Sequence, residues 1–423
     1  MLLRFRVANH RSIRGEHELS LIATEFNEGT ARDTGLHYKG RDVPALPVLA
    51  LYGANASGKS NLIKSLWFMR RAVLDSFADW AKVPDVVPRE PFKLDPTSRE
   101  ETSLFEVDLV LGPEPVRYTY GFELSDERVE AEWLHAYPHG RRNVWFDREA
   151  DRPESEGGEF IFRGTGFKGR RDDLVSLTRP NALFLSTGAA LNDPQLSMLY
   201  RWFVNNLLFI APDADVRVRT NFTMRLMTDF DQRADYARRI VRMLQMADLG
   251  LTGFHVVPET GKVELRHRTP DGGDAPMDFM EESLGTHAWF GFLGPMLIAL
   301  DEGSVLVVDE LDSSLHPMLA AEVVRIFQDP DANPHGAQLI FTTHDATLLG
   351  NAVLDRPIGR DQIWLIVKNR SGETELYPLT EAKPRKEENI ERAYLRGRYG
   401  GVPRVTAGEI VRALSRHGDE VTA

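Results

Sequence analysis

Apolar and polar positions are arranged in two distinct ways along this chain, and each predicts a different part of the fold. Continuous apolar runs at 48–52, 304–308 and 338–341 are typical of strands buried on both faces, which suit the centre of a parallel sheet. After the first run, apolar residues recur every three or four positions from Leu62 to Phe77, the spacing of a helix with one face in a core. This order of elements predicts an α/β core.

Period-two alternation dominates elsewhere and predicts antiparallel strands. It is clearest over 103–146, where short runs separated by turn residues indicate a meander, and it recurs at 2–8 and 17–23. A helical region is expected from about 193 to 248, and strand character returns over 253–268. The sequence therefore predicts an antiparallel lobe and a helical insertion beside the α/β core.

Composition and charge narrow the class of protein. With 423 residues, 42% of them hydrophobic and 27% charged, the chain can bury more than one core and has an ordinary globular composition. Its formal net charge of −12 at pH 7 argues against a surface that is basic throughout, as extensive nucleic-acid binding would need. The absence of cysteine excludes disulfides. Its most apolar stretch, 291–300, is about half of what spans a bilayer, so we expect a cytoplasmic protein without membrane contact.

The segment with the clearest chemistry is the loop between the first buried strand and its helix. Residues 53–60 read G-A-N-A-S-G-K-S, the spacing of a P-loop in its strand–loop–helix context. Gly53 and Gly58 let backbone N–H groups surround phosphate oxygens, and the helix start adds its positive dipole. Lys59 would reach the β- and γ-phosphates, and Ser60 would ligate Mg²⁺. We therefore expect ATP and Mg²⁺ as ligands. Two more side chains of this segment complete the expected nucleotide contacts: Asn55 and Asn61.

The apolar run at 304–308 ends in two carboxylates, Asp309 and Glu310, and α/β sheets bind ligands at such strand ends. Asp309 would hold Mg²⁺ through water, and Glu310 would polarise the attacking water as a general base. The alternative is a buried strand that ends in acidic residues by chance. The P-loop earlier in the chain favours the catalytic interpretation.

Three further segments flank this strand. L-D-S-S-L-H-P follows it at 311–317, a later apolar strand ends in T-T-H at 342–344, and S-L-G-T at 283–286 begins an apolar helix. Ser283 and Gly285 at that helix start offer hydroxyl and backbone N–H donors to a phosphate. Taken alone, S-L-G-T is a capping sequence, and only its neighbours give it a functional interpretation.

The chain resembles the heads of ABC-type ATPases of the SMC and OLD-like kind. The resemblance rests on five motifs in a fixed order: the P-loop, the S-x-G-T signature, the Asp-Glu strand end, the Asp-bearing loop and T-T-H. The chain is more closely similar to the AAA-family ATPases of bacterial abortive-infection and restriction-linked loci, the RloA-like group. N-H-R-S-I at 9–13 and Y-L-R-G-R-Y-G-G-V-P at 394–403 also match that group, except that His10 and Ile13 stand where it has phenylalanines.

The resemblance implies roles for further residues. Arg11 would contact the nucleotide near the adenine or α-phosphate, Asp312 would communicate across a subunit interface, and His344 would sense the γ-phosphate. Ser283 and Gly285 would complete the γ-phosphate site of a facing subunit. Because each chain has one P-loop and one signature, a head-to-tail homodimer or higher homo-oligomer is expected. The Q-loop glutamine of such ATPases is missing from its expected place, and which residue replaces it stays open.

The expected fold class is α/β, an ABC-ATPase-like head with a P-loop parallel or mixed core sheet, an antiparallel β lobe and a helical insertion. Residues 1–147 would form the amino-terminal ATPase lobe with the P-loop and the antiparallel subdomain. Residues 148–250 would form a loop and helical insertion. Residues 251–423 would form the carboxyl-terminal lobe with the signature, acidic pair and switch histidine.

Three functions are open at this point. The first is an ATPase switch that controls a separately encoded effector in an antiphage or toxin-like system, since 361–423 contains no acidic nuclease cluster. The second is an ATPase that engages nucleic acid in repair or recombination. Its best basic cluster is formed by the arginines at 141–142 and 170–171 with Arg163 and Lys168. The third is a binding module that holds ATP as structural glue, which the intact pair Asp309 and Glu310 argues against.

Overall fold

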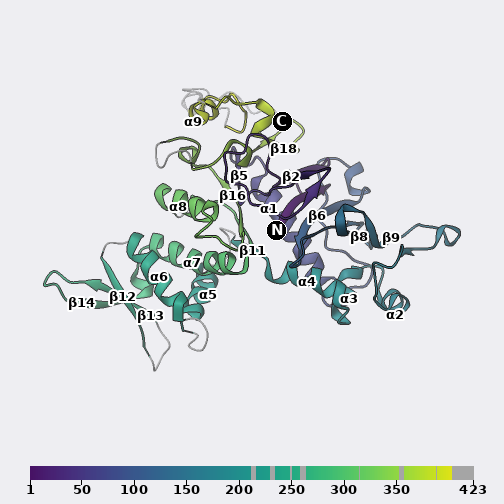
Figure 1. Ribbon diagram of the computed structural model, residues 1–423, viewed down its shortest axis with the longest axis horizontal. Helices are drawn as coiled ribbons and strands as arrows, with labels where there is room; N and C mark the ends of the chain where they lie inside the picture. The colour runs from purple at the N-terminus through teal and green to yellow at the C-terminus, as the bar shows by residue number, and fades with distance from the viewer. Residues whose placement is uncertain are drawn as a thin grey trace, which may run out of the picture.

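Two β-sheets organise the chain, and both combine segments that lie far apart in the sequence (Figure 1). The computed structural model describes residues 1–210, 216–228, 234–247, 250–257, 263–313, 315–351, 357–386 and 388–402. The six-stranded core sheet has the order β11-β15-β16-β5-β17-β18. Its first five strands are parallel, and β18 pairs antiparallel with β17. The strands are β5 (Val48–Gly53), β11 (Leu207–Ile210), β15 (Val305–Val308), β16 (Gln338–Thr343), β17 (Ile363–Lys368) and β18 (Thr374–Pro378).

The core sheet is buried on both faces, as its continuous apolar runs predict. Alternate residues of β5 point into two separate cores, Leu49 and Leu51 into one and Val48 and Ala50 into the other. The first core contains α1 (Lys59–Asp75) and the second contains α7 (Leu284–Glu302) and α8 (Pro317–Gln328). The sheet is therefore a middle layer that positions helices on both sides.

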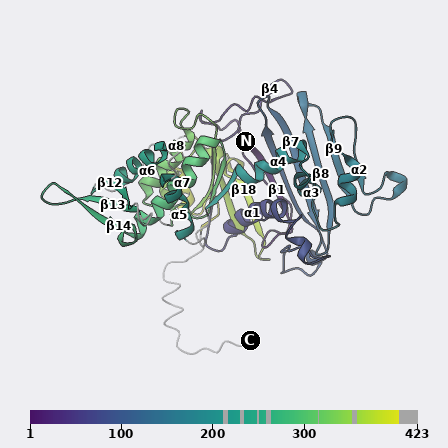
Figure 2. The same ribbon diagram turned by 90° about the horizontal axis from the view of Figure 1, so that it is seen from below.

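The second sheet is antiparallel throughout and has seven strands in the order β10-β9-β8-β7-β6-β1-β2. Helix α1 lies between the two sheets (Figure 2) and shares one hydrophobic core with both of them. Helices α3 and α4 join this core. The strands are β1 (Leu2–Ala8), β2 (His17–Ser20), β6 (Ser103–Leu111), β7 (Val116–Leu124), β8 (Val129–Tyr137), β9 (Asn143–Glu149) and β10 (Phe160–Ile161). The helices beside it are α2 (Arg171–Leu177), α3 (Phe184–Ala190) and α4 (Pro194–Asn205).

The expectation of one helical region over 193–248 is wrong at its centre. After α4 the chain forms β11, which pairs in parallel with β15 at the edge of the core sheet. Two helices follow, α5 (Val216–Thr228) and α6 (Ala234–Ala247), and both pack against α7. A four-residue apolar run cannot be assigned to helix or strand by periodicity alone, so only its pairing with β15 decides the matter. Residue 248 lies outside the described part of the chain.

A third sheet extends away from the body of the molecule at the side of α5 to α7 (Figures 1 and 2). It contains β12 (Leu251–Val256), β13 (Val263–Arg268) and β14 (Asp274–Asp278), all antiparallel. A two-stranded hairpin, β3 (His37–Tyr38) and β4 (Arg41–Asp42), interrupts the polar segment before β5. Near the end of the described chain, α9 (Ile390–Leu395) packs beside η6 (Ala346–Leu349).

The predicted fold class is confirmed, because the structure has a P-loop core sheet, an antiparallel lobe and a helical part. Within the described residues, none of the helices has both the length and the apolar composition that a bilayer-spanning helix needs.

Candidate nucleotide site

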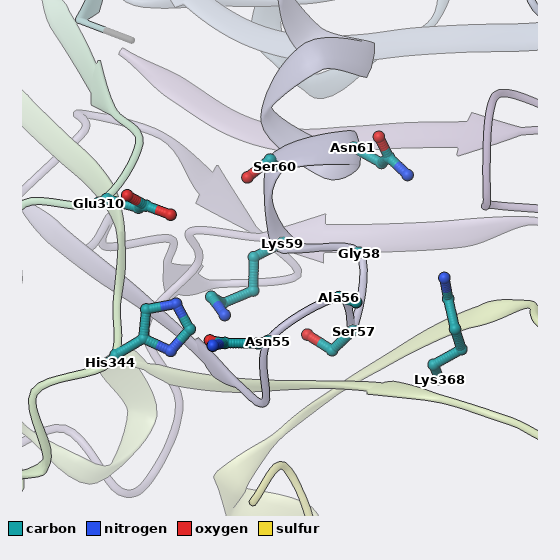
Figure 3. Close-up of a pocket in the computed structure, with 10 residues that line it drawn as sticks. All are labelled: Asn55, Ala56, Ser57, Gly58, Lys59, Ser60, Asn61, Glu310, His344 and Lys368. Atoms are coloured by element: carbon teal, nitrogen blue, oxygen red, sulfur yellow. The ribbon is translucent and has the colours of Figure 1, made fainter. Parts of the chain in front are cut away.

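The core sheet brings three predicted motifs to one edge. The P-loop follows β5, Asp309 and Glu310 follow β15, and His344 follows β16. These strands are parallel neighbours, so their carboxyl ends meet, which is where α/β sheets bind ligands. A cavity of about 530 Å³ opens there (Figure 3). Its lining residues are Asn55, Ala56, Ser57, Gly58, Lys59, Ser60, Asn61, Glu310, His344 and Lys368.

Both P-loop glycines occupy positions where a side chain does not fit. Gly58 has φ +108° and precedes α1, and a Cβ there would collide with the Thr374 hydroxyl. A Cβ on Gly53 would collide with the carbonyl oxygen of Ile366 and the hydroxyl of Ser57. The loop therefore packs closely on β17 and β18, and its N–H groups are held around the cavity.

Lys59 is folded back along the P-loop. Its ammonium donates to the carbonyl oxygens of Gly53 at 2.8 Å and Ala54 at 3.1 Å, and the residue is only 5% exposed. Burial lowers the pKa of Lys59 to about 8, while the nearby carboxylates of Asp309 and Glu310 act in the opposite direction. The side chain stays mostly charged at neutral pH, and phosphate oxygens are stronger acceptors for it than carbonyl oxygens.

A hydrogen-bond relay from β16 fixes the acidic pair. The Thr342 hydroxyl donates to Asp309 Oδ1 at 2.6 Å and accepts from the backbone N–H of Glu310 at 2.7 Å. Glu310 has φ +57°, a left-handed conformation that turns the chain at the end of β15. Its carboxylate faces the P-loop across the cavity (Figure 3). Asp309 is buried behind it, at 5% exposure.

Asp312 and His344 lie side by side at the same edge. The backbone N–H of His344 donates to both carboxylate oxygens of Asp312, at 3.2 and 3.3 Å. The His344 side chain is exposed and lines the cavity, whereas Asp312 is half-buried. The loop after β15 is thus linked directly to the end of β16.

Six predicted site residues do not line this cavity: Gly53, Asp309, Asp312, Ser283, Gly285 and Arg11. Ser283 and Gly285 line a separate cavity of about 480 Å³ at the start of α7, which shares no lining residue with the P-loop cavity. The Ser283 hydroxyl caps α7 by accepting from the N–H of Thr286 at 3.1 Å. Arg11 is not a lining residue either, and its guanidinium donates to Glu90 at 2.6 Å.

Sequence reasoning missed Lys368, Thr374 and the role of Thr342. The signal for Lys368 was the apolar run of β17, which ends in a charged residue just as β15 does. Thr342 belongs to the predicted T-T-H motif, but its hydrogen bonds to the acidic pair were not predicted. Thr374 acts through hydrogen bonds to distant segments, and no local pattern marks such a partner.

The residues present fit Mg²⁺ only in company with a nucleotide. Nowhere in the described ranges do three or more His, Asp or Glu side chains gather as metal ligands. Mg²⁺ at phosphate-transfer sites takes one or two protein ligands and completes its shell with water and phosphate oxygens. The Ser60 hydroxyl and the Asp309 carboxylate belong to that donor class.

Comparison with known proteins identifies a family. Residues 48–350 match the family described as "AAA domain, putative AbiEii toxin, Type IV TA system". No curated protein matches the chain. Among solved structures, similar folds include the SMC head domain from Thermotoga maritima, with 14% identity, TM-score 0.40, and coverage of 89% of this chain and 98% of that chain.

Two further solved structures are similar at comparable levels. The Smc head domain from Pyrococcus furiosus, bound to the C-terminal domain of ScpA, has 13% identity, TM-score 0.40, and coverage of 90% and 97% of the two chains. The cbiO1 protein from Clostridium perfringens, part of an ABC transporter complex, has 11% identity, TM-score 0.31, and coverage of 93% and 94%.

Proposed function

Since this chain belongs to the AAA-domain family whose model covers residues 48–350, we propose that it is a Mg²⁺-dependent ATPase that pairs head to tail and switches a separate effector. One observation carries the ATPase assignment: Lys59, Ser60 and Glu310 line a single cavity at the carboxyl edge of the core sheet. A module that only stores ATP does not need a carboxylate facing the P-loop. The geometry therefore supports hydrolysis over structural binding.

Each residue has a task in this reaction. The P-loop N–H groups and Lys59 bind the β- and γ-phosphates and hold them in line for attack. Ser60 and Asp309 would hold Mg²⁺, which would supply positive charge to the phosphates. Glu310 orients the attacking water and accepts its proton. The relay through Thr342 holds Glu310 in position for this role.

Pairing is supported by the separation of the two cavities. The signature residues Ser283 and Gly285 cannot complete the P-loop cavity of their own chain, because they line a different one. Large apolar side chains beside the signature are strongly exposed, and such patches mark protein interfaces. They are Met246 at 80%, Met280 at 65%, Leu284 at 85% and Met318 at 44%. A second copy that brings its P-loop to this surface would cover them and complete both sites.

The effector is a separate protein of an antiphage or toxin-like defence system. The family description, which names a toxin and a type IV toxin–antitoxin system, supports this assignment. The nucleic-acid alternative has less support, because three of the arginines that suggested it have local partners. Arg142 contacts His135 at 2.9 Å, Arg170 pairs with Asp173 at 3.5 Å, and Arg171 donates to backbone carbonyls.

The test is the variant Glu310→Gln, which keeps the side-chain shape and removes the base. We expect ATP turnover to fall by about a hundredfold or more. We also expect the variant to form a stable dimer or larger species with ATP and Mg²⁺, measured as an increase in mass by light scattering. Glu302→Gln is the matched control, because Glu302 is exposed at the end of α7 and lies outside the cavity. Unchanged turnover and unchanged mass in Glu310→Gln would contradict the catalytic assignment.

The effector is tested by co-expressing the chain with the product of the neighbouring gene. We expect that product to co-elute with the chain. When ATP is present, the amount of co-eluting product should differ between wild type and Glu310→Gln. The same amount with and without ATP, and in both proteins, would contradict the switch.

A further inference from the structure

The P-loop cavity contains a second lysine that no motif accounts for. Lys368 is the last residue of β17, which runs parallel to β5 and pairs Ile366 with Gly53, the first residue of the P-loop. Its side chain is exposed and lines the cavity. Among the described residues this side chain has no hydrogen-bond or ion-pair partner. A charged amine is therefore free beside the phosphate-binding loop.

The hairpin that carries Lys368 is fixed to the P-loop. Lys368 lies opposite Thr374 in the register of β17 and β18. The Thr374 hydroxyl donates to the carbonyl oxygen of Ser57 at 3.0 Å and lies 2.7 Å from the Ser12 hydroxyl. Gly58 has no side chain to obstruct this approach. The backbone at Lys368 is thus held in a constant relation to the loop that binds phosphate.

The two ends of the cavity differ chemically. Glu310 and His344 stand on one side of the P-loop, and Lys368 and Asn61 stand on the other (Figure 3). In the proposed function Glu310 meets the γ-phosphate, so the phosphate chain runs away from it toward Lys368. The α-phosphate and the nucleoside then lie at the Lys368 end. Of these groups only the α-phosphate is an anion that an ammonium pairs with strongly.

We propose that Lys368 binds the α-phosphate and is a second determinant of nucleotide affinity, beside Lys59. This inference rests on the proposed ATPase function. Because ATP and ADP share the α-phosphate, Lys368 contributes equally to binding both. It does not touch the group that is transferred, so it sets the affinity of the site and leaves the rate of the chemical step unchanged.

The experiment measures binding of ATP and of ADP, with Mg²⁺, to Lys368→Met by isothermal titration calorimetry, and kcat and KM for ATP. Methionine keeps an unbranched apolar stem and removes the charge. We expect Kd to rise about tenfold for both nucleotides, as for loss of one charge-assisted hydrogen bond. KM is expected to rise while kcat is unchanged, and Lys368→Arg should restore most of the affinity. Arg370→Met is the matched control, because Arg370 is exposed in the turn of the same hairpin but does not line the cavity.

Three outcomes overturn this inference without contradicting the proposed function. Wild-type affinity in Lys368→Met, or an equal loss in Arg370→Met, removes the specific contact. A loss for ATP without a loss for ADP moves Lys368 to the γ-phosphate. A wild-type protein that binds neither nucleotide contradicts the proposed function itself, and this inference with it.

Discussion

At position 10 a histidine occupies a site that suits a phenylalanine. His10 is fully buried, and its ring lies 5.1 Å from that of Phe68 and 5.3 Å from that of Phe105. Neither ring nitrogen has a hydrogen-bond partner. Burial, with a smaller effect of Arg11, lowers the pKa of His10 to about 3. An imidazole in this place carries the cost of two unsatisfied polar atoms.

His10→Phe is therefore expected to stabilise the protein by about 1–3 kcal/mol, the cost of a buried unpaired polar group. The measurement is the free energy of unfolding from denaturant titration at pH 7.5, with His37→Phe as the control, since His37 is exposed in β3. A less stable His10→Phe would mean that the pocket does not accept the larger ring.

The same residue predicts a pH dependence. The native state keeps His10 neutral, whereas the unfolded chain binds a proton below its ordinary pKa of 6.5. Above pH 6.5 this difference in proton binding has no effect on stability. As pH falls from 6.5 toward 3, it lowers the free energy of unfolding by about 1.4 kcal/mol per pH unit. His10→Phe should lose less stability than wild type between pH 6.5 and pH 5. Parallel pH profiles for the two proteins would contradict the assignment.

At the scale of elements, the sequence predicts the parts of the site that follow long buried strands. The strands β5, β15 and β16 are buried along their whole length and mostly apolar, which makes them recognisable in the sequence. Because they are parallel, their carboxyl ends meet. The P-loop, acidic pair and T-T-H could therefore be placed at one edge from the sequence. β11 could not, because its four residues become a strand only by pairing with β15. Lys368 could not, because its place in the site depends on the pairing of β17 with β5.

A hydroxyl of the hairpin formed by β17 and β18 contacts the P-loop directly. Thr374→Val keeps the shape of the side chain but leaves the carbonyl of Ser57 and the hydroxyl of Ser12 without this partner. We expect a loss of about 1–3 kcal/mol in the free energy of unfolding, together with weaker ATP binding. Thr380→Val, on a partly exposed residue just after β18, should change stability by less than about 0.5 kcal/mol. Equal effects of the two substitutions would show that the hydroxyl of Thr374 has no special role.

At the scale of the whole molecule, the signature and the P-loop act on different surfaces. Leu284, between Ser283 and Gly285, is 85% exposed, although leucine side chains are most often buried. A substitution of Leu284 can therefore test pairing without changing the stability of the monomer, because an exposed side chain contributes little to the free energy of unfolding.

Leu284→Glu, made in the Glu310→Gln background, should prevent the mass increase that ATP and Mg²⁺ cause, since a charge would be buried without a partner. Thermal unfolding without nucleotide should be nearly unchanged. Leu177→Glu is the matched control, because Leu177 is 55% exposed on α2, far from α7 (Figure 1). ATP-dependent association that persists in Leu284→Glu would contradict pairing through the signature surface.

The position of β5 between β16 and β17 also constrains how the protein is made. The ribosome completes the P-loop strand at Gly53, but its two neighbours end only at Thr343 and Lys368. While the intervening residues are synthesised, the nascent chain contains an apolar strand whose partners do not yet exist, and such strands favour aggregation. ATP cannot assist folding before β17 is made, because the P-loop cavity also includes Glu310, His344 and Lys368. Protection of β5 must come from chaperones or from the antiparallel lobe, which is synthesised long before the core sheet closes.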